Sequence, residues 1–405
     1  MFGDIVDTWG GGVVMPWRSS SVPAQRLEFV RLAESGRVPF SELCHRFGIG
    51  RSTGYKWLER FNMEGPVGLT DRPRRLKTSP GRTSNDVEAL VCAVRRRFPA
   101  WGGRKIRGFL LRQGYTDVPA ASTITTILRR HGLMEHPVAT KRDFTRFERR
   151  EPNELWGMDF KGDFALTGGG RCYPFGVIDD YSRYSLSLVA CTNQRTATVK
   201  THLTTAFTRY GLPRAMLMDN GPPWGYTPQH PWNPLTVWMC DLGIDVIHTR
   251  PRHPQTNGKK ERLHLTVDIE VLNTRPGWDT IDDVQAAFDA WNPIYNHQRP
   301  HQAPGETTVP ADRYQPSPRP IPDTITEATY PDHWDIRTVS TNIRISYRGH
   351  LYRIGKPFRG LRVAIAPTTE RDIYHVYYRH HHIKTLDTLK VSTMSPNARP
   401  RSTRS

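Results

Sequence analysis

The sequence has few cysteines, and none of them are spaced to act together. Five occur in 405 residues, and no two form a C-x-x-C pair. An odd number without such spacing supports neither a disulfide framework nor a zinc knuckle, so we expect no zinc. Isolated cysteines of this kind are typical small, buried, apolar residues of a protein from a reducing compartment. The five are Cys44, Cys92, Cys172, Cys191 and Cys240.

Long hydrophobic runs and a balancing supply of acidic residues are also missing. No stretch approaches the ~18 apolar residues that a membrane span needs, and the N-terminus lacks the apolar core of a signal peptide. The chain carries 57 Lys and Arg against 39 Asp and Glu, a net charge of +18. Residues 1–150 hold 27 of these bases and 14 of the acids, so most of the surplus lies there. We therefore expect a soluble, cytoplasmic, nucleoid-associated protein whose partner is double-stranded DNA.

A run of three histidines at 380–382 raises the question of metal binding. The flanking residues predict a strand, in which neighbouring side chains point to opposite faces of a sheet. Three consecutive histidines then cannot converge on one ion. We expect no metal site at this run.

Three stretches rich in proline or charge divide the chain, at 66–84, 135–153 and 300–323. Proline disfavours regular helix and central strand, so these stretches predict linkers or extended arms. The parts that we expect are a helix-turn-helix DNA-binding domain at 1–70, a second helical DNA-binding domain at 80–135, an α/β catalytic domain at 150–315, a small β-barrel domain at 325–392 and a disordered basic tail at 393–405.

The segment 40–61 has the features of a helix-turn-helix, preceded by an amphipathic stretch at 26–35. Two short helical stretches flank the turn Gly48-Ile49-Gly50. The alternative is a plain helical hairpin with a solvated basic face, and the basic residues nearby favour DNA binding. The residues that we expect in its core are Leu43, Phe47, Ile49, Tyr55, Leu58 and Phe61. The expected DNA contacts are Arg51, Ser52, Thr53, Lys56, Arg72, Arg74, Arg75 and Lys77.

The second block predicts three more helices with apolar stripes and basic flanks, at 86–98, 102–114 and 121–133. From Trp156 the hydrophobic period changes. Strands are predicted at 155–166, 172–182 and 184–192, followed by helix 196–211, strand 213–221, helix 235–243, strand 245–250 and helix 257–273. A meander followed by strand–helix alternation indicates a mixed sheet. Short strands at 343–355, 362–379 and 382–387 indicate a small all-β barrel.

Three carboxylates stand where chemistry could occur. Asp159 lies inside an apolar strand, and Asp219 ends another. Glu261 stands near the start of a helix. A carboxylate at a buried strand is unfavourable by several kcal/mol unless it is paired or bound to metal. Three such groups brought together need a cation between them, and Mg²⁺ suits oxygen ligands.

Five motifs in order carry a resemblance to a known family, at 156–164, 177–184, 218–225, 253–270 and 295–314. They read WGMDFKGDF, VIDDYSRY, MDNGPPWG, HPQTNGKKERLHLTVDIE and YNHQRPHQAPGETTVPADRY. Together they resemble the insertion-sequence transposases of the retroviral-integrase superfamily. The resemblance implies a ribonuclease-H-like catalytic fold in which Asp159, Asp219 and Glu261 bind two Mg²⁺ or Mn²⁺ ions.

Some features depart from that family or compete with the triad. The spacing of 42 residues from Asp219 to Glu261 exceeds that of retroviral integrases, and their zinc-binding front domain is absent. Asp179 and Asp180 are rival metal ligands, although a strand-end turn, with Asp180 bonding Ser182 or Arg183, is the favoured interpretation. Asp163 is expected in a solvated turn, and Glu270 on a helix surface beside a basic group.

Basic residues flank Glu261 and could contact DNA phosphates near the scissile bond. Lys260 and His264 share one helix face at i,i+4, which could meet either DNA or water. Asn220 could orient the metal ligands or simply cap a turn. The basic residues concerned are His253, Lys259, Lys260, Arg262 and His264.

The expected function is an enzyme that binds terminal inverted repeats, exposes a 3′-hydroxyl by metal-assisted hydrolysis and directs it at a target phosphodiester. The resemblance also implies a homo-oligomeric synaptic complex that holds two DNA ends. Two alternatives stay open. One is a metal-dependent nuclease without strand transfer, and the other is a non-catalytic DNA-binding regulator derived from a transposase.

Overall fold

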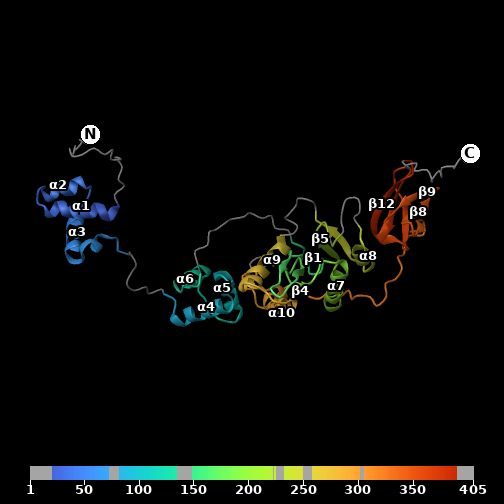
Figure 1. Ribbon diagram of the computed structural model, residues 1–405, viewed down its shortest axis with the longest axis horizontal. Helices are drawn as coiled ribbons and strands as arrows, with labels where there is room; N and C mark the ends of the chain where they lie inside the picture. The colour runs from blue at the N-terminus through green and yellow to red at the C-terminus, as the bar shows by residue number, and fades with distance from the viewer. Residues whose placement is uncertain are drawn as a thin grey trace, which may run out of the picture. The chain divides into compact units, whose positions relative to one another are not determined.

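The computed structural model contains two compact units, residues 1–82 and 83–405 (Figure 1). No helix in the part of the chain that it describes is long and apolar enough to cross a membrane. The predicted tail at 393–405 lies outside the described residues. The structure describes residues 21–72, 82–134, 148–221, 223–224, 232–249, 258–301 and 305–389.

The first unit is a three-helix bundle with the predicted helix-turn-helix. Its helices are α1 (Val22–Glu34), α2 (Phe40–Arg46) and α3 (Arg51–Glu64), followed by the 3₁₀ turn η1 (Gly65–Leu69). Gly48 adopts φ +64° between α2 and α3, a left-handed conformation that glycine reaches without strain. The core was predicted correctly at Leu43, Phe47, Ile49, Leu58 and Phe61.

Tyr55 was wrongly placed in that core. Its side chain is 59% exposed and lies over Phe40, with ring centroids 4.3 Å apart. Trp57 is buried in its place, because it stands on the face of α3 that turns toward Phe29 and Leu43.

The second unit begins with another helical block, formed by α4 (Asn85–Arg97), α5 (Gly103–Arg112) and α6 (Ala121–Arg130). The three predicted helices are present and pack around Trp101 and Ile106. The block contacts the α/β domain. Arg112 forms two hydrogen bonds of 2.7 Å with the Asp312 carboxylate, and a Cβ on Gly108 would lie 2.1 Å from the Glu306 carbonyl.

The α/β domain has a six-stranded mixed sheet. Five strands follow the order β2-β3-β1-β5-β6, and β4 also pairs with β3. Strand β1 is antiparallel to β3 and parallel to β5, and β5 is parallel to β6. This is the predicted meander followed by alternation. The strands are β1 (Leu155–Phe160), β2 (Phe164–Ala165), β3 (Arg171–Asp179), β4 (Ser185–Cys191), β5 (Ala215–Met218) and β6 (Asp245–His248).

Helices cover both faces of this sheet (Figure 1). On one face α7 (Thr196–Tyr210) and α8 (Pro234–Asp241) share a core with Trp156 and Met158. On the other, α9 (Gly258–Glu270), the turn η3 (Leu272–Thr274) and α10 (Ile281–His297) pack against Ile178 and Leu188. Helix α10 has no counterpart among the predicted elements.

The proline-rich segment after α10 is not a free linker over its whole length. It contains η4 (Pro310–Asp312), and Tyr314 is buried, with its ring centroid 4.4 Å from that of Tyr184. Arg319 donates hydrogen bonds to the carbonyls of Leu242 and Gly243, at 3.1 and 2.7 Å. Proline prevented regular structure here, but the segment still packs along the α/β domain.

The C-terminal region is all-β, as predicted, but its described strands do not close into a barrel. They form a four-stranded sheet, β12-β11-β10-β7, and a separate hairpin, β8-β9. Val237 and Cys240 of α8 join their core. The strands are β7 (Asp335–Thr338), β8 (Arg344–Tyr347), β9 (His350–Arg353), β10 (Arg362–Pro367), β11 (Ile373–Tyr378) and β12 (His381–Asp387), with the turn η5 (Lys356–Phe358) before β10. All five cysteines are buried and free.

Candidate functional site

Asp159 and Asp219 lie at the same edge of the sheet. The parallel register pairs Leu155 with Ala215 and Gly157 with Leu217. Continued by two residues, it sets Asp159, near the end of β1, beside Asp219, directly after β5. Carboxyl ends of parallel strands are the usual place for ligand sites in α/β sheets.

Glu261 lies in the first turn of α9. Burial, with the negative charges of Asp219 and Glu261, raises the pKa of Asp159 to about 6 against the opposing charge of Lys260. Both other carboxylates are therefore close enough to Asp159 to act on its charge. Their ligand oxygens do not all lie within 4.8 Å of each other.

The carboxylates fit a pair of divalent cations by their chemistry. All three donors are oxygens, which Mg²⁺ and Mn²⁺ prefer. A carboxyl group with its pKa raised by burial and by like charges is stabilised when a cation comes between it and its neighbours. Two ions ~4 Å apart also need ligands spread over more space than one ion does.

Lys260 and His264 face the sheet, which corrects the expectation that this helix face meets DNA or water. The Lys260 side chain is 4% exposed, and its Nζ lies 3.3 Å from Asp219 Oδ1 and 3.2 Å from the Met158 carbonyl oxygen. Gly157 makes room for it, since a Cβ there would lie 3.2 Å from Lys260 Cγ and Cδ. Burial, with the charges of Lys161 and Lys260, lowers the pKa of His264 to about 4.

Asp179 is held by the strand-end turn that the sequence favoured, but Asp180 is not. Asp179, not Asp180, bonds Ser182, accepting from its backbone N–H and its hydroxyl at 2.8 and 2.6 Å. Asp180 instead has distant partners: it accepts from the backbone N–H of Arg149 and pairs with Lys259 Nζ at 2.5 Å. Asp163 is exposed, as expected, and pairs with Arg171.

The loops beside the triad are held by short contacts. Asn220 donates its side-chain amide to the Thr249 carbonyl at 2.7 Å, which ties the end of β5 to the end of β6. His248 Nδ1 lies 3.3 Å from the backbone oxygen of Asp219. Asn220 therefore links the loop after β5 to the loop after β6.

A cavity of about 330 Å³ beside the start of α9 is lined mainly by basic side chains. Burial and the charge of Arg299 lower the pKa of Lys105 to about 8, and burial lowers that of Lys259 to about 8. The cavity includes Arg262, which is exposed, and Lys105 from the helical block. Its basic lining is Lys105, Arg183, Lys259, Arg262, Arg299 and His301.

Glu270 is buried, which corrects its predicted place on a helix surface. Its carboxylate lies 2.9 Å from Arg299 Nε and 3.4 Å from Lys105 Nζ, and it accepts from the Trp291 indole N–H at 3.0 Å. Its side chain is only 7% exposed. Sequence reasoning missed Lys105 and Arg299, because nothing in their spacing links them to Glu270.

Family models match most of the chain in five overlapping or separate stretches. Residues 149–254 and 242–308 match the Integrase core domain, and 334–394 match the IS481 family transposase, C-terminal domain. Residues 25–77 match a Helix-turn-helix domain and 53–128 a Homeodomain-like domain. The chain thus contains an Integrase core domain and is similar to insertion-sequence transposases.

The relatives of this chain are distant in sequence. An insertion element IS407 uncharacterized 31.7 kDa protein of Burkholderia multivorans is 28% identical over 58% of this chain and 84% of its own. The transposase for transposon Tn552 of Staphylococcus aureus is 24% identical over 65% of this chain, which spans only 58% of that protein. A simian T-cell lymphotropic virus intasome chain, solved in complex with PP2A regulatory subunit B56 gamma, is 16% identical over 72% of this chain and 96% of its own, with a TM-score of 0.35.

The helix-turn-helix presents its predicted polar face. Arg51, Ser52 and Lys56 are exposed at the start of α3, and Thr53 is half-buried. Arg72 is exposed and pairs with Glu64. The other predicted contacts, Arg74, Arg75, Lys77 and His253, lie outside the described residues.

Proposed function

We propose that this protein is a transposase that cleaves and joins DNA strands with two Mg²⁺ or Mn²⁺ ions held by Asp159, Asp219 and Glu261. The observation that carries the proposal is the meeting of two strand-end carboxylates and a helix carboxylate at one sheet edge, with mutual repulsion. When bound, the ions activate the attacking oxygen and stabilise the leaving oxygen of an in-line phosphoryl transfer.

The protein's own residues supply position and charge around that chemistry. The Lys260 ammonium group donates to the Met158 carbonyl and offsets the negative charge of Asp219, and Gly157 leaves room for its side chain. Asn220 and His248 hold the loop that carries Asp219. A water and a DNA 3′-hydroxyl are interchangeable nucleophiles at such a site, so one set of carboxylates serves cleavage and joining. No covalent protein–DNA link is needed.

DNA binding is proposed at two places. The exposed start of α3, with Arg51, Ser52 and Lys56, has the polarity of a helix that enters the major groove. The basic cavity beside α9 suits a phosphate group next to the catalytic edge. Two DNA ends must be joined together, so we propose a homo-oligomeric synaptic complex.

The test is strand cleavage and joining on an oligonucleotide copy of the element's end, with Mg²⁺, Mn²⁺ or EDTA. We expect metal-dependent products that are lost by more than about 100-fold in Asp159→Asn, Asp219→Asn and Glu261→Gln. Asp163→Asn, an exposed carboxylate in a turn, is the matched control and should retain activity.

The alternatives predict different outcomes. Cleavage without joining would favour the nuclease. DNA binding without any chemistry, unchanged by the three substitutions, would overturn the enzyme proposal and leave a DNA-binding regulator.

A further inference from the structure

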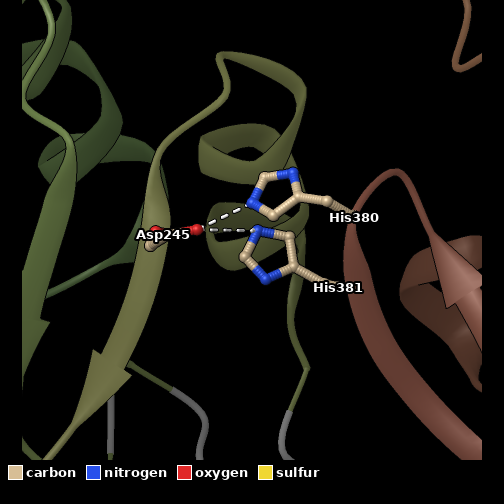
Figure 2. A group of neighbouring side chains, drawn as sticks. All are labelled: Asp245, His380 and His381. Atoms are coloured by element: carbon tan, nitrogen blue, oxygen red, sulfur yellow. Dashed lines mark hydrogen bonds and ion pairs between the residues drawn. The ribbon is translucent and has the colours of Figure 1, made fainter.

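The turn between β11 and β12 brings two histidines against the catalytic domain. His380 and His381 both face Asp245, the first residue of β6 (Figure 2). Asp245 Oδ1 lies 2.7 Å from His380 Nε2 and 3.8 Å from His381 Nε2. The three ligand atoms all lie within 4.8 Å of one another, and no other group of at least three His, Cys, Asp or Glu residues in the described ranges does so.

Strand alternation does not separate these two histidines, contrary to the prediction from the sequence. His380 lies in the turn, before β12 begins at His381, so the two side chains leave the backbone in a turn geometry and converge. His382, inside β12, turns elsewhere, and its Nε2 lies 3.1 Å from the Thr385 hydroxyl. Only two of the three histidines therefore share this position.

His381 is mostly buried, and its side chain is 14% exposed. Its Nε2 atom is buried and has no hydrogen-bond partner among the described residues, and it lies 3.8 Å from Asp245 Oδ1. Buried polar atoms in proteins nearly always have a partner, either a protein group, a water or an ion.

The distances at this junction suit a bound ion. An ion between His381 Nε2 and Asp245 Oδ1, which lie 3.8 Å apart, would give the buried nitrogen a partner. Around a tetrahedral ion with bonds of about 2.0–2.2 Å, ligand atoms lie roughly 3.3 Å apart. Small side-chain rotations bring the present distances to that value.

We propose that Asp245, His380 and His381 bind one divalent transition-metal ion of the Zn²⁺ type. Two imidazole nitrogens and one carboxylate oxygen favour such an ion over Mg²⁺. Three protein ligands leave one position for solvent on the side where His380 is exposed. The site is separate from the carboxylates of the catalytic edge, and its ligands come from two domains.

The proposed role is to fasten the β domain to the catalytic domain. The same junction contains Asp241 of α8, whose carboxylate accepts from Tyr378 Oη at 2.5 Å and Arg379 Nε at 2.9 Å. Val237 and Cys240 of α8 are buried in the core of the β domain. A bound ion adds a coordinated link to this junction and stabilises it by its binding free energy.

The test is titration of the full-length protein with Zn²⁺ and Co²⁺ in excess Mg²⁺, which keeps the catalytic carboxylates occupied. We expect one tight ion per chain, a Co²⁺ absorption spectrum typical of nitrogen ligands, and a higher Tm with Zn²⁺. His381→Gln, His380→Gln and Asp245→Asn should each weaken binding at least about tenfold and remove the Tm increase. His382→Gln is the matched control and should bind as the wild type does.

Circular dichroism of each variant without metal checks that it is folded. If a histidine variant does not fold, Asp245→Asn still tests the site, because this substitution preserves the side-chain volume. Absence of a Zn²⁺ site in the folded wild type would overturn the proposal. So would binding that all three substitutions leave unchanged. Neither result depends on strand cleavage, so the catalytic proposal is tested separately.

Discussion

At the scale of single residues, Asp159 is the most informative of the three carboxylates at the sheet edge. Its side chain is largely removed from water at the end of β1, and two further carboxylates act on it. Lys260 offsets part of that repulsion but does not reverse it, since the pKa of Asp159 still lies near 6. The ionised carboxylate is therefore destabilised in the metal-free protein, and a bound cation would stabilise it.

Asp159→Asn should stabilise the metal-free protein at pH 7 while it abolishes strand cleavage. The folded pKa of about 6 lies above the ordinary 3.8, so the folded state holds a proton that the unfolded state loses between these values. Stability of the metal-free wild type must then fall as pH rises from about 4 to about 6. Asparagine cannot ionise, so the variant should gain about 1–2 kcal/mol at pH 7.

Chemical denaturation in EDTA at pH 4.5 and pH 7 measures this difference. Asp163→Asn, whose carboxylate is exposed, should follow the wild type at both pH values. Equal wild-type stability at the two pH values, or an Asp159→Asn protein that is less stable at pH 7, would contradict the assignment of charge at this edge.

At the scale of secondary-structure elements, α3 depends on a glycine that faces its partners. A Cβ on Gly54 would lie 2.8 Å from Cys44 Sγ and 2.9 Å from ring atoms of Phe29 and Phe40. Helix interiors usually disfavour glycine. Here its missing side chain lets α3 approach α1 and α2 closely, which sets the orientation of the exposed residues Arg51, Ser52 and Lys56.

Gly54→Val should destabilise the helix-turn-helix by about 1–3 kcal/mol because the added methyl groups overpack a close contact. Hydrogen exchange of residues 22–69 in the full chain should then accelerate, and binding to the element's end should weaken. Ser52→Ala, on the exposed face of the same helix, should keep wild-type exchange rates and change DNA binding alone. Wild-type exchange rates in Gly54→Val would contradict this prediction, because they would mean that the helices accommodate the larger side chain without loss of stability.

The start of α9 belongs to the same scale, since it contributes Lys259 and Arg262 to the basic cavity. Arg262→Gln should weaken DNA binding and reduce the magnitude of the salt slope by about 0.9, the value for one phosphate contact. Affinity measured from low to moderate salt gives this slope. Arg371→Gln, on the β domain and 97% exposed at its side chain, is the control. An unchanged salt slope in Arg262→Gln would mean that Arg262 in this cavity does not contact a DNA phosphate.

At the scale of the whole molecule, buried charge joins the helical block to the α/β domain. Glu270 ends α9, Arg299 follows α10 and Lys105 belongs to α5, so one carboxylate connects three elements. Burial opposes ionisation of Glu270, but Arg299 and Lys105 outweigh it and keep its pKa below the ordinary value. Removing one partner of a buried ion pair leaves the others uncompensated.

Glu270→Gln should lower the stability of the second unit by about 3 kcal/mol near pH 7. A depressed pKa means that the stabilisation is present above the unfolded value of 4.5 and is lost as pH falls through the lower folded value. The free energy of unfolding, measured from pH 7 down to low pH, should therefore differ between wild type and variant at pH 7 and become similar at low pH. Glu327→Gln, a carboxylate exposed at 78%, is the control. A constant difference at every pH would mean that packing, not charge, is lost.

Local patterns determined a large part of this protein. The period of apolar residues predicted the helices of both front blocks and the order of strands and helices in the α/β domain, because each pattern reports a local, repeating geometry. The motifs around Asp159, Asp219 and Glu261 predicted the carboxylates that the sheet edge brings together, since the order of parallel strands follows from the alternation. The strand-end turn at Asp179 was also readable, as its partner Ser182 is three residues away.

Contacts between distant residues were decided only by the tertiary structure. Lys260 was expected on a helix face that meets DNA or water, but α9 packs on the sheet with this side chain beside Asp219. Glu270 meets Lys105 across 165 positions, and His380 meets Asp245 across 135. Helical period and strand alternation carry no information about such pairs. These contacts form only when elements that are distant in the sequence pack against each other.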